Sequence, residues 1–92
     1  MKSIVLDNIE YELIKNEKDS FVYDDIANIF TDYFYDYDYV VGDYAYSKLR
    51  LKGFYDVNNK KVRYLNNINN LDKYIKNQCA YNCGYFVLKK KS

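Results

Sequence analysis

Apolar and polar side chains alternate along the start of the chain, the pattern of a β-strand with one buried face. Residues 3–15 predict a hairpin that turns at Asp7 and Asn8, because Asp and Asn tolerate the positive φ angles of a two-residue turn. In the register that pairs Leu6 with Ile9, one face of the hairpin is apolar and the other carries glutamates. The apolar face contains Ile4, Leu6, Ile9, Tyr11 and Leu13.

Two segments repeat apolar residues at the three- and four-residue spacing of an amphipathic helix. The first predicted helix runs from about Val22 to Phe34, with Ser20 as its cap and a mainly acidic outer face. The second has Asn69 or Asn70 as its cap. It ends near Cys79, and its buried stripe would be Leu71, Tyr74, Ile75 and Cys79.

Two further segments predict strands of different kinds. Residues 35–41 alternate Tyr and Asp before an apolar end, so we expect a strand that stops near Gly42. Residues 85–88 are apolar without alternation, which is typical of a strand buried on both faces. We therefore place residues 85–88 at or near the centre of the sheet.

Residues 48–56 and 60–65 predict a second hairpin, with its turn at Asn58 and Asn59. One face of this hairpin would be apolar and the other basic with an aromatic ring in its middle. The basic face consists of Lys48, Arg50, Lys52, Phe54, Lys61 and Arg63. Such a face suits single-stranded nucleic acid, because cations attract the backbone and an aromatic ring stacks on a base. Long basic side chains on a strand also serve to discourage edge-to-edge pairing.

The element order β-β-α-β-β-β-α-β predicts an α+β fold. We expect one small domain over residues 1–92, with two helices and a mixed, mostly antiparallel sheet of about five to six strands. Proline is absent and only three glycines are present, so no linker is indicated. The chain has 13 tyrosines, and its many Tyr, Asn, Lys and Ile residues, all with AT-rich codons, indicate an AT-rich genome.

The net charge of +1 conceals an uneven distribution of charge. Residues 1–43 contain three basic and eleven acidic residues, whereas residues 44–92 contain eleven basic and two acidic residues. Asymmetry of this kind can indicate an interaction surface. The alternative is that the two halves neutralise each other in the folded chain, and the sequence leaves both open.

Few residues point to catalysis. Histidine, the commonest general base, is absent, and the glycines do not form a phosphate-binding loop. Asp36, Asp38 and Asp43 could hold a magnesium ion only if a turn gathered them. Cys79 and Cys83 supply two of the four ligands of a structural zinc site, so core packing is their expected role. No cofactor and no metal site is predicted.

The start of the chain lacks the apolar stretch of a signal peptide. No apolar run approaches the roughly 18 residues that a membrane span requires. These observations predict a cytoplasmic protein that does not contact a membrane.

Three segments resemble the YutD-like family of low-GC Gram-positive bacteria and their relatives. The segments are residues 37–43, the Leu-Arg-Leu-Lys-Gly-Phe run of residues 49–54, and residues 71–88. Residues 11–14 extend the similarity over nearly the whole chain. Gly42, Asp43, Tyr44 and Gly53 form a candidate functional or structural motif, although the family often has tryptophan where this chain has Tyr44. The resemblance transfers no catalytic residue.

These observations together predict a small binding module without enzymatic activity. The leading partner is RNA or another polyanion, bound at the basic face of the second hairpin. The alternative is a protein-interaction module whose acidic helix or basic sheet docks on a larger cytoplasmic assembly, without direct contact to nucleic acid. An acidic protein surface would be the partner of the basic sheet. A metal-dependent enzyme that uses Asp43 is a distant third.

Overall fold

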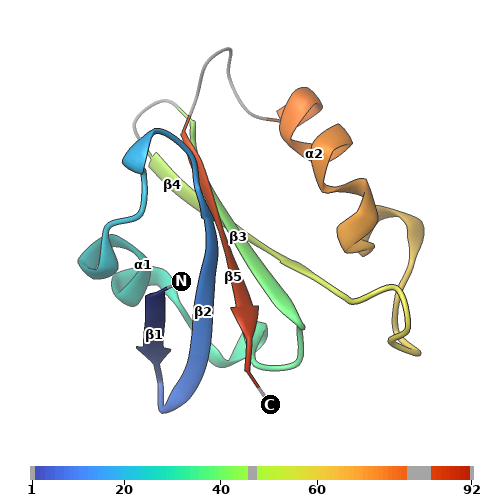
Figure 1. Ribbon diagram of the computed structural model, residues 1–92, viewed down its shortest axis with the longest axis horizontal. Helices are drawn as coiled ribbons and strands as arrows, with labels where there is room; N and C mark the ends of the chain where they lie inside the picture. The colour runs from blue at the N-terminus through green and yellow to red at the C-terminus, as the bar shows by residue number, and fades with distance from the viewer. Residues whose placement is uncertain (1, 46–47, 79–83, 92) are drawn as a thin grey trace.

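The computed structural model describes residues 2–45, 48–78 and 84–91. Within these residues, five strands form one antiparallel sheet in the order β1-β2-β5-β3-β4, with α1 and α2 on opposite sides (Figure 1). The strands are β1 (Lys2–Leu6), β2 (Ile9–Asn16), β3 (Tyr39–Ala45), β4 (Lys48–Phe54) and β5 (Tyr85–Lys90). The helices are α1 (Tyr23–Ile29) and α2 (Leu71–Gln78), and four short 3-10 turns join the elements. The predicted α+β fold is confirmed.

The first hairpin has the predicted turn and register. Leu6 lies opposite Ile9, and Asp7 and Asn8 adopt φ angles of 51° and 67°. Such positive angles at both central residues match the right-handed twist of the flanking strands. All five residues of the predicted apolar face belong to the core or pack against it, namely Ile4, Leu6, Ile9, Tyr11 and Leu13.

The predicted first helix is shorter than expected. Helix α1 ends at Ile29, because Phe30 has an extended backbone with ψ 129°. A separate 3-10 turn, η2 (Asp32–Phe34), then returns Phe34 to the core, where it stacks on Phe30 at 5.7 Å between ring centroids. Ile26, Phe30 and Phe34 are buried, whereas Val22, Ile29 and Tyr33 are exposed. The apolar spacing therefore predicted neither the end of the helix nor its full set of buried residues. The predicted Ser20 cap is also wrong, since the residue preceding the helix is Val22.

The predicted second hairpin is not formed. Strand β4 pairs with β3 in the register that sets Gly42 opposite Leu51, and β3 continues through Gly42 to Ala45. Residues 57–62 form turns instead of a strand. Hydrogen bonds to Asp38 hold this segment in place. Its Oδ2 accepts from Asp56 N at 2.8 Å and from Asn59 Nδ2 at 2.9 Å.

The sheet has an apolar core on each face. The core beneath α1 contains Ile4, Leu6, Tyr11, Ile26, Phe30, Phe34, Val40, Phe86 and Leu88. The smaller core beneath α2 contains Val41, Phe54 and Val87, with Ile68, Leu71, Tyr74 and Ile75 packed on it. Strand β5 contributes side chains to both cores. This arrangement confirms that residues 85–88 are buried on both faces.

The acidic and basic halves of the chain neutralise each other in part. Lys61–Asp36, Arg50–Asp43 and Lys91–Glu10 are ion pairs that join the two halves, with nitrogen–oxygen distances of 2.6, 2.6 and 3.6 Å. Asp24 and Asp32 of the segment around α1 remain exposed. The uneven charge of the sequence is therefore reduced but not removed by folding.

Replacing Tyr11 with phenylalanine is expected to raise the free energy of unfolding by about 1 kcal/mol at pH 7. The Tyr11 side chain is 0% exposed, and its hydroxyl has no hydrogen-bond partner among the described residues. Burial raises the pKa of Tyr11 to about 12 from an ordinary value of 10. The unfolded chain therefore ionises first, so this tyrosine removes stability as the pH rises from 10 to 12, by up to about 3 kcal/mol. Urea denaturation at pH 7 and pH 11 measures both effects.

Tyr23→Phe is the matched control for this prediction. The Tyr23 hydroxyl donates to the Val5 carbonyl at 2.8 Å, so its removal should lower stability by about 0.5–1 kcal/mol. If Tyr11→Phe is as destabilising as Tyr23→Phe, the Tyr11 hydroxyl has a partner after all.

Candidate functional site

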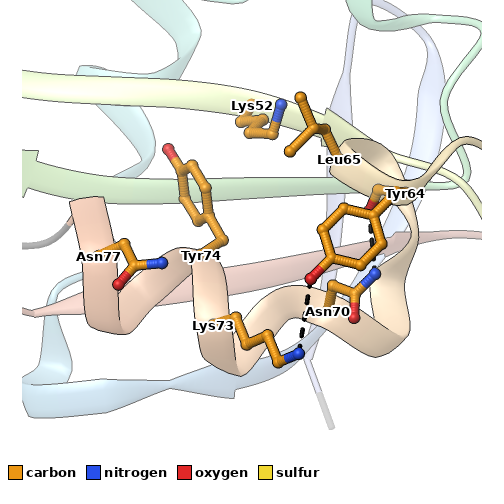
Figure 2. A pocket seen from close by; sticks show the side chains of 7 residues that line it. All are labelled: Lys52, Tyr64, Leu65, Asn70, Lys73, Tyr74 and Asn77. Carbon is orange, nitrogen blue, oxygen red and sulfur yellow. Dashed lines mark hydrogen bonds between the residues drawn. The ribbon is translucent and has the colours of Figure 1, made fainter.

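A groove lies between the end of β4 and one side of α2. Its volume is about 390 Å³, and it is lined by Lys52, Tyr64, Leu65, Asn70, Lys73, Tyr74 and Asn77 (Figure 2). Lys52 comes from β4, Tyr64 and Leu65 from η3 (Tyr64–Asn66), and Asn70 from η4 (Ile68–Asn70). Helix α2 contributes the other three residues. The groove is thus assembled from three separate segments of the chain, which we call the β4–α2 groove.

Asparagine side chains shape the wall of the groove that carries Tyr64. Asn66 Oδ1 accepts the backbone N–H of Arg63 at 2.6 Å, and Asn67 Oδ1 accepts that of Asn69 at 2.9 Å. Asn70 Nδ2 donates to the Tyr64 carbonyl at 2.9 Å. Asparagine favours such local bonds to the backbone, and here they fold residues 63–70 into consecutive turns.

Two lysines face aromatic rings across the groove. Lys73 Nζ lies 3.5 Å from the Tyr64 hydroxyl oxygen and 5.9 Å from the centre of the Tyr64 ring (Figure 2). Lys52 Nζ lies 5.4 Å from the ring centre of Phe54 and 5.7 Å from that of Tyr74. None of the seven lining residues is acidic, so the groove is cationic.

Two tyrosine rings line the groove at different depths. The Tyr64 side chain is 64% exposed, which leaves much of its ring open to a ligand. Tyr74 is half-buried and packs edge-on against Phe54, with ring centres 5.5 Å apart. Burial raises the pKa of Tyr74, and the nearby Asp43 carboxylate raises it further. Tyr74 therefore keeps its proton at neutral pH and can donate a hydrogen bond.

The six basic and aromatic residues of the predicted binding face do not share one surface. Lys48, Arg50, Lys52 and Phe54 do lie on the same side of β4, but Phe54 is fully buried and cannot stack on a base. Arg63 Nη1 donates a hydrogen bond to the Val62 carbonyl, at the end of the turns that replace the predicted strand. Of the six residues, Lys52 alone lines the β4–α2 groove.

Lys61 lies apart from β4 and forms an ion pair with Asp36. Its Nζ is 2.6 Å from Asp36 Oδ2, which also accepts a hydrogen bond from the Tyr55 hydroxyl. These two bonds, that from Lys61 first, lower the pKa of Asp36. The contact leaves Lys61 exposed but places its charge beside a carboxylate.

All four residues of the predicted motif have a structural role inside the fold. Asp43 is 1% exposed and receives Arg50 Nη2 at 2.6 Å from the opposite position on β4. The Tyr44 hydroxyl donates to Asp25 Oδ2 of α1 at 2.9 Å. A β-carbon at Gly53 would overlap the Tyr37 ring. The fourth residue, Gly42, makes room for a core ring in the same way.

The three aspartates considered for magnesium have other partners. Asp36 binds Lys61, Asp38 binds the segment at Asn59, and Asp43 binds Arg50. Across the described residues, no three Asp, Glu, Cys or His side chains gather as a metal site would require. Cys79 and Cys83 lie outside the described residues. None of the helices described is long and apolar enough to cross a membrane.

Of the seven residues that line the groove, the sequence predicted only Lys52 as a binding residue. The sequence predicts Tyr64 in a strand of the second hairpin and Tyr74 in the buried stripe of the second helix. The signal that could have found more of the groove residues is on α2 and the turn before it. Asn70, Lys73, Tyr74 and Asn77 follow the spacing of one helix face.

Comparisons with known proteins agree on one family. The profile of the YutD-like family, described as "Putative antitoxin YutD-like", matches residues 5–89. The chain is 44% identical over 87 residues to "Putative antitoxin YutD" of Bacillus subtilis (strain 168), covering 95% of this chain and 96% of that protein. The solution NMR structure of protein yutD from B. subtilis has a TM-score of 0.83 at 42% identity, covering 99% of this chain and 83% of that one. The chain described here therefore belongs to the YutD-like family.

Proposed function

We propose that this protein is a binding module without enzymatic activity, and that its β4–α2 groove holds single-stranded nucleic acid, with RNA as the leading partner. The composition of the groove is the observation that carries this proposal. Two lysines, two tyrosines and two asparagines line it, and none of its side chains is acidic. This set supplies each interaction that an unpaired nucleotide offers.

The charges of the groove suit a phosphate backbone. Lys52 and Lys73 enter it from opposite walls, one from β4 and one from α2. Each lysine that neutralises a phosphate releases a counterion, which makes the affinity fall with salt. Two such contacts predict a log–log slope of about −1.4 on single strands.

The tyrosines and asparagines suit an unpaired base. The exposed ring of Tyr64 offers a stacking face, and stacking contributes about 1–3 kcal/mol per base in single-strand binding. The carboxamides of Asn70 and Asn77 have the donors and acceptors that base edges recognise. A volume of about 390 Å³ is at the scale of a small-molecule pocket. It is suited to a nucleotide rather than to a duplex.

A protein partner is the second candidate. The description of the B. subtilis relative as a putative antitoxin favours it, because it suggests that the relative acts on a partner molecule. Transferred to this chain, that description supports a module that acts by binding.

Lys73→Glu is expected to weaken binding of a fluorescein-labelled twelve-nucleotide oligouridine about tenfold, because it replaces a phosphate-binding cation with an anion. Tyr64→Ala should weaken it by about fivefold or more through lost stacking. Fluorescence anisotropy at several salt concentrations measures both affinities and the slope. Lys2→Glu on β1, at the opposite edge of the sheet, makes the same change of charge and should have little effect.

Two results would exclude the nucleic-acid proposal. One is an affinity for oligouridine that responds to Lys2→Glu as much as to Lys73→Glu, which indicates only net charge. The other comes from capture of partners from the cytoplasm of the source cell. If nuclease treatment leaves the captured partners unchanged, the protein candidate takes its place.

A further inference from the structure

Strand β4 lies at an edge of the sheet. The order β1-β2-β5-β3-β4 leaves the side of β4 that faces away from β3 without a strand among the described residues. An edge strand presents backbone N–H and C=O groups that can pair with another chain. The groups on this side of residues 48–53 are therefore available in principle to a further strand.

A hollow of about 420 Å³ follows this edge. It is lined by Arg50, Leu51, Lys52, Gly53, Tyr33, Tyr37, Leu65, Asn66 and Tyr74. Successive residues of a strand point to opposite faces, so a hollow lined by residues 50–53 in a row runs along the strand edge rather than over one face. Tyr33 and Tyr37 flank it on the α1 side, and Leu65 and Tyr74 on the α2 side.

Another segment of the chain already pairs with Tyr55, which follows β4 on the same edge. Tyr55 forms an isolated parallel bridge with Asn67 directly after β4. The Tyr55 N–H donates to the Asn66 carbonyl at 2.7 Å, and the Ile68 N–H donates to the Tyr55 carbonyl at 3.0 Å. This segment covers Tyr55 and stops at the end of the hollow. The edge from Lys48 to Gly53 continues without such a cover among the described residues.

We infer that this edge of β4 accepts an extended, acidic segment of a partner protein as a sixth strand. Backbone hydrogen bonds to β4 would provide the affinity, and alternate side chains the specificity. On the α2 side, Lys48 and Lys52 favour acidic side chains, since the charge of Arg50 is offset by Asp43. On the other side, Tyr33 favours apolar side chains.

A second copy of this chain fits the edge poorly. An antiparallel pair of β4 strands centred on Arg50 would place Lys48 of one copy opposite Lys52 of the other. Like charges directly opposite each other destabilise a strand pair. The basic residues of β4 thus oppose self-association and admit a strand of opposite charge.

This inference goes beyond the proposed nucleic-acid groove, which lies next to the hollow on the α2 side of β4. The hollow and the β4–α2 groove share Lys52, Leu65 and Tyr74. Occupants of the two sites would therefore compete. Lys48 lies on the same strand edge but lines neither the hollow nor the groove, whereas Lys73 lines only the groove. Changes at these two lysines therefore test the two proposals separately.

The test uses a seven-residue peptide that alternates Glu and Val, with blocked ends. On binding, the β4 amides that face away from β3 should exchange their hydrogens at least tenfold more slowly, measured residue by residue by NMR. Lys48→Glu should lower the affinity for this peptide about fivefold. It should raise the affinity for a matched peptide that has Lys in place of Glu. Lys73→Glu should leave the affinity for the acidic peptide within twofold.

The same peptide with N-methyl groups on alternate backbone nitrogens is the control, because it keeps its charge and loses its edge hydrogen bonds. Equal binding of this control would overturn the inference. So would unchanged exchange over residues 48–53 in the bound state, or chemical-shift changes confined to α2 and Tyr64. Loss of oligouridine binding in Lys48→Glu, with peptide binding intact, would assign this edge to nucleic acid instead.

Discussion

Gly42→Ala is expected to lower the free energy of unfolding by about 3 kcal/mol, the upper part of the usual range for overpacking. A β-carbon at residue 42 would overlap Cζ of Phe86 and lie 2.6 and 2.7 Å from its Cε atoms. Phe86 is fully buried and meets Phe21 edge-on at 5.1 Å, so its ring cannot turn into solvent. Urea denaturation followed by circular dichroism measures the loss.

The partner of Gly42 provides the control. Gly42 and Phe86 are paired across β3 and β5, so shortening Phe86 should make room for the new methyl group. In a double-mutant cycle, Gly42→Ala with Phe86→Leu should cost less than the sum of the two single changes by about 1 kcal/mol or more. Additive costs, or a loss below about 0.5 kcal/mol for Gly42→Ala, would show that the glycine is not required by this ring.

The position of Gly42 explains one error of the sequence interpretation. The strand of residues 35–41 was expected to stop near Gly42, whereas β3 continues through it to Ala45. A glycine inside a strand often marks a close approach of another group, as it does here. The reason for this glycine is a phenylalanine on β5, far away in the sequence. A local pattern cannot contain that information, because the ring and the glycine meet only when β5 lies beside β3.

Locally determined elements were predicted well. The first hairpin combines regular alternation with a turn that Asp7 and Asn8 favour, and both its turn and its register were correct. Asn58 and Asn59 gave a similar turn signal, but no strand follows them. There β3 supplied a competing partner for β4, and the asparagines instead join a loop held by Asp38.

The candidate site was predicted only in part for the same physical reason. Lys52 could be found because β4 alternates basic and apolar residues. The groove beside it needs Tyr64 from a turn and Lys73 from α2, and these three segments meet only in the folded chain. The apolar stripe of α2 was visible, whereas its groove-facing side depended on where residues 63–70 fold.

Arg50→Met is expected to lower the free energy of unfolding by about 3 kcal/mol, because it leaves a buried carboxylate without its cation. Asp43 is 1% exposed, and its Oδ1 already lacks a hydrogen-bond partner among the described residues. We expect the lower end of the range for a broken buried pair, since the Arg50 side chain is 42% exposed. Chemical denaturation at pH 7 is the measurement.

Two variants separate this effect from a general loss of a surface charge. Lys61→Met breaks an ion pair of the same 2.6 Å length, but its side chains are 60% and 56% exposed, so the cost should stay below about 0.5 kcal/mol. Asp43→Leu combined with Arg50→Met replaces the buried pair by apolar groups and should recover most of the stability. If the double variant is as unstable as Arg50→Met alone, the unpaired carboxylate is not the cause. Recovery in the double variant would instead make Arg50 a structural partner of Asp43, and Lys48 and Lys52 would carry the charge that β4 offers to a ligand.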